Sequence, residues 1–204
     1  MLVERLEASQ LTPAPLDDMV ETLHRLSGLQ TPVPGEKALA AYHADFRGRP
    51  RFLKGYKRLH AALLRRRSDG TDPSGRLQGL LETVCALPRV FSHGDPDARN
   101  ILAGGMVLDW DLCGHLPLGW DQAWVARDAL EENSLRGALT FFDVFLRRDK
   151  VTEAAHSFGF LFFLMLFHAL RYGRAASPEF IGDIFLHLEE RQQILPCIGA
   201  APTR

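Results

Sequence analysis

The chain has 204 residues, with 24 basic and 25 acidic side chains and a formal net charge of −1 at neutral pH. Hydrophobic residues make up 46% and charged residues 24%. This mixture excludes a disordered tail, a collagen-like fibre and a disulfide-stapled mini-protein. The near-neutral charge gives no reason to expect a nucleic-acid partner, and the length suits one domain with a sizeable core or two small ones.

Targeting signals and cysteine chemistry are not expected. Glu4 and Glu7 interrupt the N-terminal sequence, and no apolar segment follows them, which argues against a secretory signal. The most apolar stretch, residues 158–167, is shorter than the roughly 20 residues that span a bilayer, so a buried core helix is predicted. The three cysteines are far apart and form no CxxC pair, which disfavours a disulfide framework or a zinc site. We therefore expect a cytoplasmic protein without a membrane partner.

Helical periodicity dominates the first part of the chain. Apolar residues at helical spacing predict a helix over about 16–26, and a second follows over about 36–46. A third has its apolar stripe over 52–63, and a short fourth covers about 76–86. The composition of residues 68–75 is that of a loop.

The third predicted helix has a basic face opposite its apolar stripe. This face could attract an anionic substrate or nucleic acid, but a solvated helix face is the favoured interpretation. Its members are Arg47, Arg51, Lys54, Arg58 and Arg65.

The middle of the chain differs from both flanks, because residues 90–111 hold short apolar runs broken by Gly and Asp. Beyond Pro117 the helical period returns. Ser177 is expected to cap the last helix, since Pro178 suits a first helical position. The predicted helices lie near 121–130, 134–148, 152–172 and 178–195.

A β-hairpin is predicted in this middle segment, because Gly104-Gly105 separates two short apolar runs. A two-residue turn would place Leu102 opposite Val107 and Asn100 opposite Asp109. Directly opposed residues have Cβ atoms roughly 5 Å apart, so the two polar side chains should converge. Hard oxygen ligands at that separation suit Mg²⁺, which takes few protein ligands and completes its shell with phosphate and water.

The loop before the hairpin has the sequence FSHGDPDARN over residues 91–100. Asp95 could orient a substrate hydroxyl and accept its proton beside the metal pair. His93 could hold the loop through hydrogen bonds to backbone groups. The alternative for Asp95, Asn100 and Asp109 is a turn-rich loop with a hydrogen-bonded network of Asp and Asn side chains.

The sequence HGDPDARNIL followed by VLDWD resembles the aminoglycoside phosphotransferase and choline-kinase-like group, whose members are relatives of the protein kinases. The resemblance implies Asp95 as the catalytic base and Asn100 and Asp109 as Mg²⁺ ligands, with ATP as the phosphoryl donor. Asp111 corresponds to the acid of the group's IDWE-type sequence. Asp121, in the segment GWDQA, corresponds to an acid that usually helps to hold the loop, and a structural role is also favoured for His93.

The sequence also departs from that group. Asp97 stands where the group often has His, and Pro96 stands where Leu is common. An extra carboxylate at position 97 could repel a phosphate or join the metal shell. Kinases cover the nucleotide with a Gly-rich strand pair and a Lys–Glu ion pair in an N-terminal lobe, and no such sequence precedes residue 20.

The expected fold is therefore mainly α with one small β-hairpin, the C-terminal lobe of a protein-kinase-like (α+β) fold whose N-terminal β-rich lobe is missing. One lobe would span residues 1–204, with the catalytic loop and hairpin at 90–112 and helical parts at 14–87 and 119–195. An apolar surface is expected where the missing lobe would dock, so self-association or a partner chain there is plausible.

Three functions fit these features. The first is a phosphotransferase that moves the γ-phosphoryl group of ATP to a hydroxyl of a small molecule. A cationic substrate would have Asp128, Glu131 and Glu132 as speculative contacts. The second, supported by the missing lobe, is a truncated, non-catalytic binding module derived from a kinase, that is, a pseudokinase-like protein. The third is a metal-dependent hydrolase, although the His-rich ligand set common at such sites is lacking.

Overall fold

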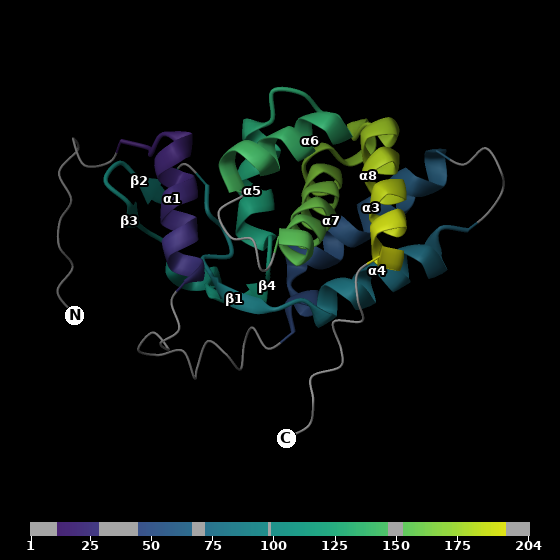
Figure 1. Ribbon diagram of the computed structural model, residues 1–204, viewed down its shortest axis with the longest axis horizontal. Coiled ribbons are helices and arrows are strands. Elements are labelled where there is room, and N and C mark those ends of the chain that lie inside the picture. The colour runs from purple at the N-terminus through teal and green to yellow at the C-terminus, as the bar shows by residue number, and fades with distance from the viewer. Residues whose placement is uncertain (1–11, 29–44, 67–71, 98, 147–152, 195–204) are drawn as a thin grey trace, which may run out of the picture.

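The computed structural model describes residues 12–28, 45–66, 72–97, 99–146 and 153–194, and most of them are helical (Figure 1). The mainly α prediction is confirmed. The predicted helix over 36–46 lies almost wholly outside the described residues, and its last residue opens a 3₁₀ turn, η2 (Phe46–Gly48). Part of the predicted loop at 68–75 also lies outside them.

The core is built around α7 (Glu153–Tyr172), in which every residue from Ser157 to Ala169 is buried. It packs against α3 (Pro50–Arg66), α5 (Trp120–Ala129) and α8 (Pro178–Ile194), with α4 (Ser74–Ala86) covering α7 and α8. Among the described residues, only the segment Glu153–Ala175 is long and apolar enough to cross a membrane, and 72% of its apolar 18-residue window is buried inside the protein. Packing on all sides therefore accounts for its composition, as the sequence predicted.

Two helices, α6 (Leu135–Phe141) and α8, begin at serine caps. The Ser177 hydroxyl accepts a hydrogen bond from the Phe180 amide (3.1 Å), which confirms the predicted cap of α8. Ser134 caps α6 in the same way through the Gly137 amide (3.0 Å). α6 continues as a π-helical turn, η4 (Phe142–Leu146), so the predicted helix over 134–148 has two parts.

A second, smaller hydrophobic cluster lies at the other end of the molecule, around α1 (Leu16–Ser27) and the hairpin (Figure 1). α5 stands between the two clusters, because Val125 belongs to the smaller one while Trp120 and Trp124 belong to the larger one. The smaller cluster consists of Ala14, Met19, Leu23, Leu26, Phe91, Ile101, Cys113 and Val125.

The described residues form two antiparallel strand pairs, one more than predicted. β1 (Arg89–Ser92) pairs with β4 (Gly114–Pro117), with Arg89 opposite Pro117 and Ser92 opposite Gly114. This pair closes the segment between residues 93 and 113 into a loop. The loop starts directly after β1, and β4 ends three residues before α5 begins. Four-residue strands without a hairpin turn leave too weak a periodicity to be recognised in the sequence.

The predicted hairpin forms, but its register is one residue away from the prediction. β2 (Ile101–Leu102) pairs with β3 (Met106–Val107), so that Leu102 lies opposite Met106. The Gly105 amide donates to the Leu102 carbonyl (3.0 Å), which closes a turn with Gly104 at its third position. Both glycines have positive φ, 83° and 79°, and they form a three-residue loop with Ala103. Asn100 therefore lies opposite Leu108 and not, as predicted, opposite Asp109.

Candidate active site

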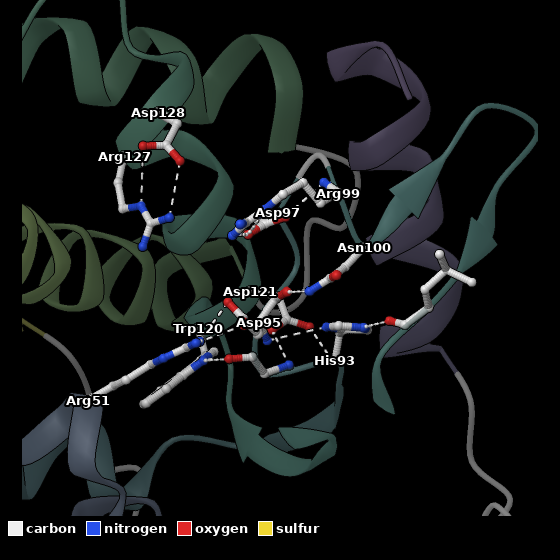
Figure 2. Close-up of polar contacts among 12 residues, drawn as sticks. Arg51, His93, Asp95, Asp97, Arg99, Asn100, Trp120, Asp121, Arg127 and Asp128 are labelled. Carbon is white, nitrogen blue, oxygen red and sulfur yellow. Dashed lines mark hydrogen bonds and ion pairs between the residues drawn. The ribbon is translucent and has the colours of Figure 1, made fainter. Parts of the chain in front are cut away.

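The first turn of α5 holds the loop that follows β1. The carboxylate of Asp121 accepts hydrogen bonds from the backbone amides of His93 (2.6 Å) and Gly94 (2.9 Å), as Figure 2 shows. The Trp120 indole donates to the Gly94 carbonyl (3.2 Å). Burial raises the pKa of Asp121, although both backbone donors and the charge of nearby Arg49 act to lower it. The loop is thus fixed to α5, whose Trp120 belongs to the larger core.

The His93 ring connects the loop to the hairpin. Its Nε2 lies 2.7 Å from the Leu108 carbonyl, and its Nδ1 accepts a hydrogen bond from the Asp95 amide (3.3 Å). A carbonyl only accepts, so this arrangement requires the hydrogen on Nε2 and a lone pair on Nδ1. The ring therefore fixes the backbone of Asp95 relative to the residue before Asp109.

Gly94 permits the close packing of this loop. Its φ is +86°, and a Cβ there would collide with the backbone oxygen of Leu112 and with the Arg49 side chain. Positive φ and a backbone collision together leave glycine as the residue that fits. Backbone geometry alone therefore accounts for the glycine in the His-Gly-Asp sequence.

Asp95 has a largely buried side chain, which is 13% exposed and pairs with Arg51 of α3. One guanidinium nitrogen donates to Oδ2 (2.8 Å), and the other lies 2.6 Å from Oδ1. Two-point contact of this kind fixes the orientation of the carboxylate. Reasoning from the sequence placed Arg51 on a basic helix face and missed this ion pair.

Asn100 and Asp109, the predicted metal ligands, are not directly opposed, because Asn100 lies opposite Leu108 and Asp109 comes one residue later. The Asn100 side-chain nitrogen donates to the Asp95 carbonyl (2.9 Å), so its amide oxygen is the atom left for a metal ion. The Leu108 amide donates to the Asn100 carbonyl (2.8 Å), and Asp109 follows directly, exposed. Asp109 is the one non-glycine residue in the described part of the chain with a positive φ, 55°. Such backbone strain concentrates at functional sites and here turns the chain out of the ladder.

The donor atoms of these two residues suit Mg²⁺ better than a metal that takes all of its ligands from protein side chains. No group of three or more His, Cys, Asp or Glu side chains that could hold a metal occurs among the described residues. An amide oxygen and a carboxylate are the hard ligands that Mg²⁺ takes, with phosphate and water in its other positions.

The other acids near the loop have partners or face solvent. Asp97 accepts hydrogen bonds from the Arg99 amide (2.8 Å) and guanidinium (2.6 Å). Burial would raise the pKa of Asp97, but these bonds from Arg99 leave it lowered. Asp111 is exposed in a 3₁₀ turn, η3 (Trp110–Leu112), while the ring of its neighbour Trp110 packs against His93 with centroids 5.3 Å apart.

The acids predicted as speculative contacts of a cationic substrate do not form one group. Asp128 forms ion pairs with Arg127 (3.1 Å) and Arg171. Glu131 and Glu132 line another cavity, of about 270 Å³, which Arg136 also lines.

A larger cavity, of about 500 Å³, adjoins Asp95 through its partner Arg51. Arg51 and Lys54 of the predicted basic face line it, so this part of the face is not simply solvated. Arg65 is exposed, as predicted for the whole face, while Arg58 donates to the Leu170 carbonyl. The cavity residues that the sequence analysis missed are Trp124, Arg127, Leu170 and Arg171. Trp124 and Arg127 are three residues apart on one helix, and this spacing could have indicated that their side chains share a face.

A model of the phosphotransferase enzyme family matches residues 1–153. The chain belongs to this family. The resemblance seen in the sequence is thus confirmed, and membership implies a kinase-like fold, with which the mainly α lobe agrees. The matched range contains the loop, the hairpin and α5, whereas most of α7 and all of α8 lie beyond it. No curated protein and no solved structure matches the chain.

Proposed function

We propose that this phosphotransferase family member transfers the γ-phosphoryl group of ATP to a hydroxyl of a small molecule. The observation that carries the proposal is the position of Asp95. Its backbone is fixed by His93 and Asn100, and its carboxylate pairs with Arg51, which lines a cavity of about 500 Å³. A carboxylate in a fixed loop, one ion pair away from a ligand-sized cavity, is suited to orient the hydroxyl of a bound molecule.

Each residue has a defined task in this proposal. Asp95 accepts a hydrogen bond from the acceptor hydroxyl and takes its proton as the phosphoryl group is transferred. The amide oxygen of Asn100 and the carboxylate of Asp109 hold Mg²⁺. Bound ATP with Mg²⁺ supplies the phosphoryl group and neutralises the charge that develops on it. Asp121 and His93 act on the backbone of the loop and are positioning residues.

A non-catalytic binding module is the second candidate, and the Arg51–Asp95 ion pair favours it. A carboxylate that contacts a guanidinium at two points is not free to orient a hydroxyl until Arg51 moves. The described strands are also limited to two short pairs, neither of which carries a phosphate-clamping Gly-rich loop. In the first proposal another lobe or a partner chain supplies that clamp.

Binding and transfer are tested separately on the full chain. Thermal denaturation with ATP and Mg²⁺ tests the nucleotide site, since a ligand at about 100 times its Kd stabilises the folded state by about 2.7 kcal/mol. Asp109→Asn should remove the Mg²⁺-dependent part of this stabilisation, while Asp143→Asn, an exposed carboxylate in η4, should leave it unchanged. No stabilisation at millimolar nucleotide would contradict the phosphotransferase proposal for this chain.

Transfer is then followed by ADP release with a panel of hydroxyl compounds. Asp95→Asn should lower turnover by about 100-fold or more, the usual contribution of a general base, with folding intact. Wild-type turnover in this variant would show that Asp95 is not the base. Nucleotide binding without transfer to any acceptor would favour the binding module.

A further inference from the structure

The cavity lined by Arg51, the ion-pair partner of Asp95, is strongly basic. Four of its side chains are cationic, namely Arg51 and Lys54 from α3, Arg127 from α5 and Arg171 from the end of α7. No carboxylate lines it among the residues that the structure describes. In Figure 2, Arg51 reaches Asp95 from α3 while Arg127 extends from α5 on the same side of the loop. Three separate helices thus direct positive charge at one space of about 500 Å³.

Trp124 forms a wall that holds two of these cations, Arg51 and Arg127. The Arg127 guanidinium lies 3.7 Å from the centre of its ring, and the Arg51 guanidinium lies 4.7 Å from it. Stacking on an indole holds a guanidinium in place while its N–H groups remain available at the edge. Planar donors fixed in this way suit the oxygens of a phosphate or carboxylate.

The carboxylates near the cavity do not balance its charge. Asp95 pairs with Arg51, and Asp128 serves both Arg127 and Arg171. A third carboxylate, Asp97, acts on Arg127 through its charge but forms its own ion pair with Arg99. In the described ion pairs, the four cations of the cavity therefore share two carboxylates. Burial and the neighbouring Arg171 lower the pKa of Arg127 to about 10, although Asp95 and Asp97 act in the opposite direction. An anion in the cavity would relieve this repulsion between like charges.

We propose that this cavity binds an anionic group, a phosphate or a carboxylate, of the molecule that accepts the phosphoryl group. This inference rests on the proposed function, and it replaces the cationic substrate considered from the sequence with an anionic one. The cavity volume lies within the range of small-molecule sites. Because Arg51 touches both the cavity and Asp95, the acceptor hydroxyl lies a few bonds away from the anionic group.

Arg51 also links substrate binding to the base. It contacts the Asp95 carboxylate at two points and lines the cavity at the same time. An anion that attracts Arg51 toward the cavity weakens its hold on Asp95, which frees the carboxylate for a hydroxyl. The ion pair that would obstruct catalysis in the free protein is then exchanged for one with the substrate.

Calorimetric titration of the full chain with inorganic phosphate, citrate and spermidine, at constant ionic strength, tests the charge of the ligand. Phosphate or citrate should bind at the cavity and spermidine should not compete. Lys54→Gln and Arg171→Gln should each weaken anion binding by about ten-fold, the effect of losing one charged hydrogen-bond donor. Lys57→Gln makes the same charge change at an exposed position of α3 outside the cavity lining and should have little effect. Equal weakening in Lys54→Gln and Lys57→Gln, or no anion binding, would overturn the inference.

The nucleotide is also an anion, so its site must be separated from the cavity. Asp109→Asn should weaken Mg²⁺-dependent ATP binding and leave phosphate binding unchanged. Saturable phosphate binding in a chain that transfers phosphoryl groups to no acceptor would support the anion site and contradict the proposed function. Transfer to a cationic acceptor that phosphate does not inhibit would support the proposed function and overturn the anion site.

Discussion

The two ends of the molecule are stabilised in different ways. The end around α7 is a broad apolar core in which rings pack edge to face, such as Phe163 against Phe46 with centroids 6.0 Å apart. The end around α1 and the hairpin has a small apolar cluster, and its loop is held by a few hydrogen bonds, above all those to Asp121. Stability thus rests on the first region, while the geometry of the candidate site rests on a handful of polar contacts between the two. The two properties should respond to different substitutions.

The largest expected effect comes from removing a ring from the α7 core. Phe163 is fully buried among Phe46, Trp120 and Phe167. Phe163→Ala should lower the free energy of unfolding by about 4 kcal/mol, through lost transfer energy and the cavity left behind. Urea denaturation followed by circular dichroism measures this change.

The counterpart in the smaller cluster is Leu23→Ala, which should cost about 3 kcal/mol or less because that cluster is small. Hydrogen exchange should then increase first in α1 and the hairpin, while α7 keeps its protection. If the amides of α7 lose protection to the same extent as those of α1, the two clusters unfold as one unit. That result would contradict the separate stabilisation of the two ends.

The second prediction concerns pH and belongs to the α7 region. His168 is buried beside the rings of Tyr172 and Phe180, and burial lowers its pKa to about 4. Its ordinary pKa is 6.5, so between pH 6.5 and pH 4 the unfolded chain binds a proton that the folded chain does not. Stability is therefore lost as the pH falls through this window, by about 3 kcal/mol in total.

The measurement is the free energy of unfolding at several pH values for wild type and His168→Phe. The variant should show a weaker decline on acidification, because carboxylates contribute equally to both proteins. His24→Gln, a change at an exposed histidine of α1, should leave the wild-type slope unchanged. Parallel curves for wild type and His168→Phe would contradict the assignment.

The third prediction addresses the contact between the two regions. Asp121→Asn replaces one carboxylate oxygen by an NH₂ group, so one of the two loop amides loses its acceptor. The expected cost is about 2 kcal/mol, the effect of leaving a buried donor unpaired. Hydrogen exchange at the His93 and Gly94 amides should rise, with Asp183→Asn, a change at an exposed acid of α8, as the control. Unchanged exchange at both amides would show that other contacts hold the loop.

The sequence was most informative where structure depends on local periodicity. The apolar stripe of α3, the length of α7 and the Ser177 cap all follow from residues within a few positions of each other. The sequence of the loop and hairpin also sufficed to indicate the family. The same segment contains Asp95 and Leu108, which the structure connects through the His93 ring.

Contacts between distant elements could not be predicted in this way. The pair of Arg51 and Asp95 joins residues 44 positions apart and depends on how α3 packs against α7. The cluster of Arg51, Arg127 and Arg171 likewise requires three helices to meet, and each arginine alone is typical of a solvated helix face. The basic stripe was noticed, but only packing decides which of its members face a cavity.

The hairpin register shows a finer limit. Two glycines fit a two-residue turn and also a longer loop in which both residues keep positive φ, and the sequence does not distinguish these turns. The difference of one residue moves Asp109 beyond the position opposite Asn100. The predicted convergence of the Asn100 and Asp109 side chains rested on the register that does not form. The observed hydrogen bonds from Asn100 to Asp95 and from His93 to Leu108 instead fix the loop and the residue before Asp109.

The smallest expected effect tests this turn. Gly104 has a φ of +83°, and no atom lies within 4 Å of the place that a Cβ would occupy, so Gly104→Ala meets a conformational cost without a collision. That cost is about 1 kcal/mol. Gly75→Ala, in the first turn of α4 with equally open space, should instead stabilise by about 0.5 kcal/mol, because alanine restricts the unfolded chain. Opposite signs in urea denaturation would support the three-residue loop. A neutral Gly104→Ala would mean that the turn adopts a negative φ at this position, and the register of Asn100 would have to be revised with it.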